Sequence, residues 1–412
     1  MKRVYTSKGN IACFVVLMLI VFQNWISQKI NAWSLFDEIF TLFLLILVCI
    51  SRTYCANYKF SKFDIYIGTS VIIYWLVTTF SSFFFEYQSF KTSVMASFLG
   101  IKWFIVFWSV KYLCKSKYNS IFNNSDKVIH KVIIVFAIVE NWYWINNIQN
   151  VFNARMYYNA LSPIYLCAVN VMLVAILFMQ WRDTRLDWVC LILLLENLIF
   201  STKAKGYAAA LLTVVIFVWV IKKNRKIKIY ELLVMALLSI MLVWEKVYFY
   251  YVYASAPDHD YARYRLMATG FQILKDYFPI GTGWGTWGSY YSSVSYSPVY
   301  YIYGLENHHE LGIENQKYMM DSYLASVMGE SGFIGVLIIF IFTIAIFIIV
   351  NKLFRKDLRI YAAGLLCISY LCITFVEETG FANPALIGLA IVMGMIVSKW
   401  EMTNESDNTR KK

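Results

Sequence analysis

The chain has 412 residues, of which 60% are hydrophobic and only 15% are charged. Soluble domains carry nearer a quarter charged residues, so the composition excludes an ordinary globular protein. The formal net charge of +12 arises from 37 Lys and Arg against 25 Asp and Glu. The basic residues lie mostly in short segments between apolar runs, which is the positive-inside pattern of membrane proteins and not a nucleic-acid-binding surface. We therefore expect a lipid bilayer and no nucleic acid as partner.

Apolar runs recur along the whole chain, and each is long enough to cross a hydrocarbon layer of about 30 Å as a helix. The predicted fold is an all-α integral membrane protein with about twelve spans and with both termini in the cytoplasm. This orientation places most Lys and Arg in the cytoplasmic loops. In chain order the predicted spans are 11–26, 33–51, 63–85, 93–113, 132–147, 159–180, 186–201, 206–221, 229–248, 333–350, 361–379 and 383–398.

These spans divide the chain into four regions. Residues 1–248 form an N-terminal bundle of nine spans, and residues 249–332 form one large loop outside the cytoplasm. Three further spans occupy 333–398, and 399–412 is a cytoplasmic tail. The tail is polar from Thr403 onward, which predicts disorder.

Several acidic residues fall in the outer halves of the predicted spans. Charge at membrane depth usually faces protein or water, although side chains near the interface can also reach outward to water. Both a shared polar site and simple interfacial charge remain open from this pattern. The acidic residues are Asp37, Glu38, Glu140, Glu196, Glu245, Glu377 and Glu378.

Metal binding is not indicated by the cysteines or carboxylates. Most of the eight cysteines lie inside apolar runs, and the large loop contains none. Their spacing shows neither a disulfide framework nor a zinc site. We expect no cofactor and no essential metal.

The large loop contains a predicted amphipathic helix from Tyr264 to Phe278, stopped by Pro279. Met267 and Phe271 begin an apolar stripe that continues with Leu274 and Phe278. That stripe is expected to rest on the membrane face or on the bundle. The polar stripe of Arg265, Thr269, Gln272 and Asp276 is expected to face a cavity.

A glycine-rich run follows the helix. Gly281, Gly283 and Gly285 alternate with other residues and permit backbone conformations that let a ligand approach the main chain. A flexible turn is the alternative interpretation. No G-x-G-x-x-G pattern or preceding βα unit supports dinucleotide binding.

Aromatic residues are dense after the glycines. They are interpreted either as a stacking surface for sugar rings or as an interfacial aromatic belt. The residues are Trp284, Trp287, Tyr290, Tyr291, Tyr296, Tyr300, Tyr301 and Tyr303.

The loop closes with Asp321-Ser322-Tyr323-Leu324, which leads into Glu330-Ser331-Gly332. Tyr323, Leu324, Val327 and Met328 form an apolar helical stripe, and Asp321 is well placed as the N-cap of that helix.

Three segments together resemble the O-antigen polymerase and ligase superfamily. The first segment, 265–286, contains an arginine, a helix, a proline and the G-x-G-x-G run. The second, 321–335, leads into the next span, and the third, 201–208, is similar to the family's serine-arginine-glycine turn. Lys205 stands where that turn usually has an arginine, and the histidine that ligases carry near the position of Asp321 is absent.

The resemblance implies an enzyme of the bacterial cytoplasmic membrane that joins undecaprenyl-pyrophosphate-linked oligosaccharide units into O-antigen or capsular polysaccharide. It implies a flippase and a chain-length regulator as partner proteins. The missing histidine favours a polymerase over a ligase. A non-enzymatic flippase or transporter for the same lipid-linked unit is the other alternative, although no internal repeat is evident and the long loop disfavours it.

The candidate site residues follow from this resemblance. Arg265 and Lys205 are expected to neutralise the departing pyrophosphate, and Asp321 is the first candidate for the general base, with His308 and His309 as the second. The remaining expected substrate-binding residues are Lys203, Arg263, Gly281, Gly283, Gly285 and Trp284.

Overall fold

The computed structural model describes residues 14–54, 61–115, 128–146, 161–228, 261–316, 318–377 and 380–410, together with scattered positions from 230 to 249. The described part is helical and contains no strand. Its helices are α2 (Gln23–Ser27), α3 (Phe36–Tyr54), α4 (Lys62–Phe85), α5 (Phe90–Lys115), α7 (Ile129–Asn146), α9 (Pro163–Gln180), α10 (Arg185–Phe200), α11 (Ala204–Ile216) with its continuation η3 (Phe217–Lys222), α14 (Ala262–Asp276), α15 (Tyr290–Val294), α16 (Pro298–Ile302), α17 (Tyr323–Leu353), α18 (Leu358–Glu377) and α19 (Ile387–Arg410).

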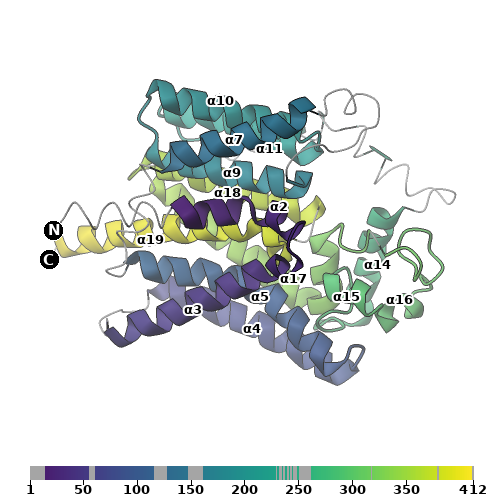
Figure 1. Ribbon diagram of the computed structural model, residues 1–412. Helices are drawn as coiled ribbons and strands as arrows, with labels where there is room; N and C mark the ends of the chain where they lie inside the picture. The colour runs from purple at the N-terminus through teal and green to yellow at the C-terminus, as the bar shows by residue number, and fades with distance from the viewer. Residues whose placement is uncertain are drawn as a thin grey trace.

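The long helices run side by side as a bundle, and α14, α15 and α16 form a lobe at one end of it (Figure 1). Eight helices in the described part are long and apolar enough to cross a membrane. They are Trp33–Ser51, Phe63–Phe85, Phe90–Lys115, Pro163–Gln180, Ala204–Lys222, Tyr323–Leu353, Leu358–Val376 and Pro384–Thr403. The chain is therefore a multi-span, all-helical membrane protein.

Four of the twelve predicted spans are not among these eight. α10 has only 16 residues, and α7 contains Lys131, Glu140 and two asparagines, which lower its hydropathy. Residues 14–21 are helical, but the rest of 11–26 includes only the short helix α2. The predicted span 229–248 lies largely outside the described residues.

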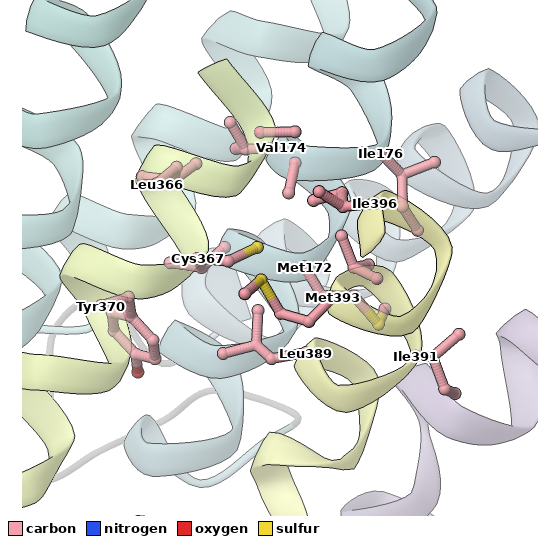
Figure 2. Packing of buried hydrophobic residues seen from close by; sticks show 14 of the residues in the cluster. Met172, Val174, Ile176, Leu366, Cys367, Tyr370, Leu389, Ile391, Met393 and Ile396 are labelled. Carbon is pink, nitrogen blue, oxygen red and sulfur yellow. The ribbon is translucent and has the colours of Figure 1, made fainter. Parts of the chain in front are cut away.

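The centre of the bundle is an apolar core around α9, in which every residue from Leu166 to Met179 is buried. Figure 2 shows Met172 and Val174 of α9 packed beside Leu366 and Cys367 of α18 and Met393 of α19. α9 is surrounded by other helices, and its sequence is apolar on almost all sides, as expected for a helix in the core of a membrane protein.

Buried ion pairs join the helices outside this core. Lys102 of α5 is fully buried and pairs with Asp37 and, at 3.2 Å, with Glu38 at the start of α3. Two of the acidic residues in the outer halves of spans therefore have a cation as partner. Nearer the C-terminal end of α5, Lys111 pairs with Asp64 and lies 2.7 Å from the Glu401 carboxylate.

Glu401 also ties α19 to Lys115 at 2.8 Å. α19 then continues to Arg410, so the prediction of a disordered tail from Thr403 was wrong. The ion pairs fix the part of α19 around Glu401. Because no glycine or proline interrupts the residues that follow, the helix continues beyond it.

The lobe has its own apolar core, in which Leu266 and Ile273 of α14 pack with Trp287 and Tyr300. α14 begins and ends two residues earlier than predicted, and it packs against α17. Its buried face includes Leu266, Thr269 and Ile273, whereas Phe271 and Phe278 are exposed. Met267 and Leu274 of the predicted apolar stripe pack against this core, so the stripe is only partly buried. Thr269, which was expected on the polar face, is buried.

Candidate functional site

Asp321 lies immediately before α17, at the end of the bundle that carries the lobe. Its carboxylate is 3.2 Å from the guanidinium of Arg263 in the first turn of α14. The side chains are 34% and 17% exposed, so the pair lies at a partly open surface. The side chain of Ser322, and not that of Asp321, accepts the backbone N–H of Ala325 and caps α17. The N-cap prediction for Asp321 was wrong, and its carboxylate is directed to an arginine instead.

Two other charged residues surround this pair. Lys203, the residue before α11, is close enough to favour the ionised form of Asp321, and Glu310 disfavours it. Burial is the largest influence and raises the pKa of Asp321 above its usual range, while Arg263 acts in the opposite direction. Glu310 itself accepts the backbone N–H of Ala262 at 2.7 Å and so holds the start of α14.

The site therefore combines residues from three separate parts of the sequence, namely the start of α11, the start of α14 and the residue before α17. Arg263 contacts one carboxylate with a raised pKa, and Lys203 acts on the same carboxylate electrostatically. This arrangement can hold an anionic group and accept a proton next to it.

Arg265 and Lys205 lie near these residues in sequence but differ in environment. Arg265 is two residues beyond Arg263 on α14, about 200° around the helix, and its side chain is exposed. Lys205 is 2% exposed in the first turn of α11. The cation in contact with Asp321 is Arg263, which the sequence placed only in the wider substrate-binding group.

His308 has a structural role in the lobe. Its Nδ1 accepts the backbone N–H groups of Glu310 and Leu311, each at 3.1 Å. An accepting Nδ1 leaves the proton of the neutral ring on Nε2, so neither nitrogen offers a vacant lone pair to an incoming hydroxyl. Its ring stacks on His309 at 4.6 Å. This geometry disfavours His308 as the general base relative to Asp321.

The glycine run packs against the protein's own helices. Gly283 has φ +98°, and a Cβ there would lie 2.6 Å from the Cα of Ser82 in α4. Gly281 has φ +73°, and a Cβ there would lie 2.6 Å from the carbonyl oxygen of Gly329 in α17. Hydrogen bonds fix the same segment, because the N–H of Thr282 donates to Gly329 at 2.8 Å and the N–H of Gly283 donates to Glu330 at 2.9 Å. The alternation of glycines thus permits the close packing of the loop between two helices.

Gly285 and Trp284 are buried in the same contact. The indole nitrogen of Trp284 donates to Thr79 at 3.1 Å, and Gln88 donates to the carbonyl of Gly285 at 2.9 Å. Trp284 is 2% exposed and packs against Gly100. A substrate-binding role for Trp284 and the three glycines stays a prediction, while their contacts in this structure are with α4, α5 and α17.

The tyrosines divide into two groups. Tyr300 is fully buried and stacks on Trp287 at 4.6 Å, and Tyr303 donates its hydroxyl to Asp276 at 2.7 Å. Tyr290 and Tyr301 are each 51% exposed. Tyr291 and Tyr296 are partly exposed, so Tyr290 and Tyr301 are the rings of this set most open to a sugar.

One buried carboxylate in this region was not singled out by the sequence. Glu330 of α17 is 5% exposed and accepts the backbone N–H of Trp287 at 3.4 Å. This hydrogen bond links α17 to the glycine-rich loop. In the sequence, Glu330 is only a polar residue beside an apolar run. Its burial became evident from the tertiary contacts alone.

The described residues include no cluster of three or more His, Cys, Asp or Glu side chains arranged to hold a metal ion. The expectation that the reaction needs no metal stays a prediction.

The geometry defines a multi-span helical membrane protein with a cationic and carboxylate site at one end of its bundle. Residues 188–340 match the Wzy_C family, which is described as O-antigen ligase. This range extends from α10 into α17 and contains Lys203, Arg263 and Asp321. The chain thus carries a domain of the O-antigen ligase and polymerase family, as the three sequence segments predicted, and no curated protein matches it.

Members of this family are transferases that join lipid-linked glycans, either as polymerases or as ligases. The multi-pass architecture is consistent with the bacterial inner membrane. The family description does not by itself distinguish polymerase from ligase.

Proposed function

We propose that the chain is a polymerase that joins undecaprenyl-pyrophosphate-linked oligosaccharide units into O-antigen or capsular polysaccharide on the outer face of the cytoplasmic membrane. The observation that carries this proposal is the meeting of Lys203, Arg263 and Asp321 within the family domain. A flippase and a chain-length regulator are the expected partner proteins.

The proposed reaction is a glycosyl transfer between two lipid-linked units. The acceptor hydroxyl oxygen forms a bond to the anomeric carbon of the donor, and the bond from that carbon to the pyrophosphate oxygen breaks. The lipid pyrophosphate leaves with the electron pair, and Asp321 accepts the proton of the hydroxyl. Lys203 and Arg263 offset the charge that develops on the leaving group, and Arg265 and Lys205 contribute further positive charge.

The local sequence around Asp321 supports a polymerase over a ligase. Its neighbours are Met320 and Ser322, and Ser322 is committed to capping α17. The described lobe contains His308 and His309, and the Nδ1 of His308 is engaged by backbone N–H groups.

We further propose that α7 and α10 cross the membrane despite their length and polarity. The turn before α10 includes Trp181, which lines a cavity together with Asn224 after η3. Beyond the other end of α10, Lys203 is near Asp321. α10 therefore connects the two ends of the bundle, over about 24 Å. α7 runs beside it, with His130 2.6 Å from Asp187 at one end and Trp144 stacked on Phe200 at the other. With the spans expected at 11–26 and 229–248, this gives twelve spans and both termini in the cytoplasm.

The test of the function is to delete the gene in its own host and to separate the surface glycan on a gel. A polymerase deletion leaves a single repeat unit on the final acceptor and removes the long ladder. If all surface units disappear and single lipid-linked units accumulate inside, the protein is a flippase. If full-length chains accumulate on the lipid carrier without reaching the acceptor, it is a ligase.

A further inference from the structure

A second charged site lies at the end of the bundle opposite the lobe. A cavity of about 510 Å³ opens between the turn after α9, the end of η3 and the turn that joins α17 to α18. α11 starts near Asp321 and continues through η3 to this cavity. α17 also starts near Asp321 and ends at Leu353, next to the cavity. The cavity is therefore separated from the candidate catalytic site by the full length of two membrane-crossing helices.

Basic residues form one side of the cavity. Arg355 and Lys356 are exposed in the turn between α17 and α18, and Arg359 follows in the first turn of α18. The guanidinium of Arg359 donates to the backbone carbonyl of Trp181 at 3.0 Å, which fixes this cation at the cavity wall.

Asp357, the one acidic residue among the described residues of the lining, is engaged by the backbone and lies 3.9 Å from the guanidinium of Arg359. Its carboxylate accepts the N–H groups of Arg359 at 3.0 Å and of Ile360 at 3.3 Å, and so caps the start of α18. Among the described residues of the lining, three cations and this one carboxylate give a net charge of about +2. The wall favours an anion.

Apart from Asn224, the remaining described residues of the lining are apolar. Trp181 and Phe354 lie beside the basic residues, where α9 and α17, two helices long and apolar enough to cross a membrane, come to their ends. A ligand in this cavity would meet cations and aromatic rings together. That combination suits a molecule with a phosphate headgroup and acyl chains, held at the membrane surface.

We propose that this cavity binds the phosphate group of an anionic phospholipid from the surrounding bilayer. Arg355, Lys356 and Arg359 bind the phosphate, and Trp181 and Phe354 contact the glycerol and the upper part of the acyl chains. A soluble phosphate would satisfy the same cations but would not use the aromatic part of the lining. The site does not depend on which glycan reaction the other end of the bundle performs.

The test uses the full chain in lipid nanodiscs of phosphatidylcholine that contain a minor fraction of phosphatidylglycerol with a photoreactive acyl chain. After irradiation, cross-linked peptides are identified by mass spectrometry. We expect cross-links to the segments that contain Trp181 and Phe354. In an Arg355→Ala/Lys356→Ala double variant these cross-links should decrease roughly tenfold, because each basic residue contributes to binding of an anionic headgroup.

The matched control is Lys352→Ala, which removes an exposed cation from the last turn of α17 outside the cavity lining. It should leave the cross-links unchanged. Equal cross-linking in the double variant and the unaltered protein would overturn the proposal. So would cross-links that are as strong with photoreactive phosphatidylcholine, or that millimolar inorganic phosphate abolishes while the lipid content stays constant.

Discussion

Asp321 and Arg263 show how the environment of one pair of side chains shapes the proposed chemistry. Burial raises the pKa of the Asp321 carboxyl, and the guanidinium of Arg263 and the ammonium group of Lys203 lower it. A carboxylate with a raised pKa is a stronger base than an ordinary aspartate, and the adjacent cations limit how far its pKa rises.

Replacement of Asp321 tests the base directly. An Asp321→Asn variant is expected to lose roughly a hundredfold to ten-thousandfold in polymerisation rate, because the amide cannot accept the proton of the hydroxyl. The rate is measured with purified protein and lipid-linked units, from the length of the ladder over time. Glu314→Gln, which removes an exposed acid elsewhere in the lobe, is the control and should behave like the unaltered protein. Retained activity in Asp321→Asn would remove Asp321 from the mechanism.

The pH dependence of the rate should respond to Arg263. The base must be ionised, so activity falls as the pH decreases through the raised pKa of Asp321. Since Arg263 holds that pKa down, an Arg263→Ala variant should move this acidic limb upward by about one pH unit. The profile is measured on kcat, with Arg263→Lys as a variant that retains the charge. An unshifted limb in Arg263→Ala would show that Asp321 does not control it.

Arg265 provides a separate test of the leaving-group role. An Arg265→Ala variant is expected to polymerise roughly a hundredfold more slowly if its guanidinium stabilises the departing pyrophosphate. The control is Lys275→Ala, which removes an exposed cation from the last turn of the same helix. A normal rate in Arg265→Ala would exclude that role and leave the charge to Lys203 and Arg263.

At the scale of elements, the glycine-rich loop stabilises the junction of the lobe with α4 and α17. Gly283→Ala introduces a methyl group 2.6 Å from the backbone of Ser82 at a φ of +98°. The expected cost is about 2–4 kcal/mol, from backbone strain and overpacking together. Gly304→Ala is the matched control, because Gly304 has φ +66° but nothing within 4 Å of the new methyl group, and it should cost only about 1 kcal/mol.

The comparison of the two glycine variants is made by thermal unfolding in detergent, followed by fluorescence-detected size exclusion. A larger loss of stability in Gly283→Ala than in Gly304→Ala would support close packing as the reason for the glycine. Similar losses would mean that the loop can move away from α4 at little cost.

At the scale of the whole molecule, the twelve-span arrangement predicts the side of the membrane on which each turn lies. Sandwich fusions are placed at Asp183, Thr202, Asn224 and Gly304. A fluorescent-protein fusion should be active at Asp183 and Asn224, which we place in the cytoplasm, and an alkaline-phosphatase fusion should be active at Thr202 and Gly304. Phosphatase activity at Asp183, or its loss at Thr202, would show that α10 does not cross the membrane.

The sequence alone was sufficient to predict an all-helical membrane protein and the resemblance to O-antigen polymerases and ligases. Those properties depend on long apolar runs and on local residue patterns, which need no knowledge of distant contacts. The number of spans did not follow in the same way, because α10 has only 16 residues and is not among the eight helices that are long and apolar enough to cross a membrane.

The tertiary structure decided which charged residues meet. It joined Asp321 to Arg263 across 58 residues, gave the capping role to Ser322, and paired Lys102 with Asp37 and Glu38. It also showed that Gly283 accommodates the backbone of α4. Such relations depend on how helices far apart in the sequence pack, since a charge buried among helices requires a partner that no local pattern specifies.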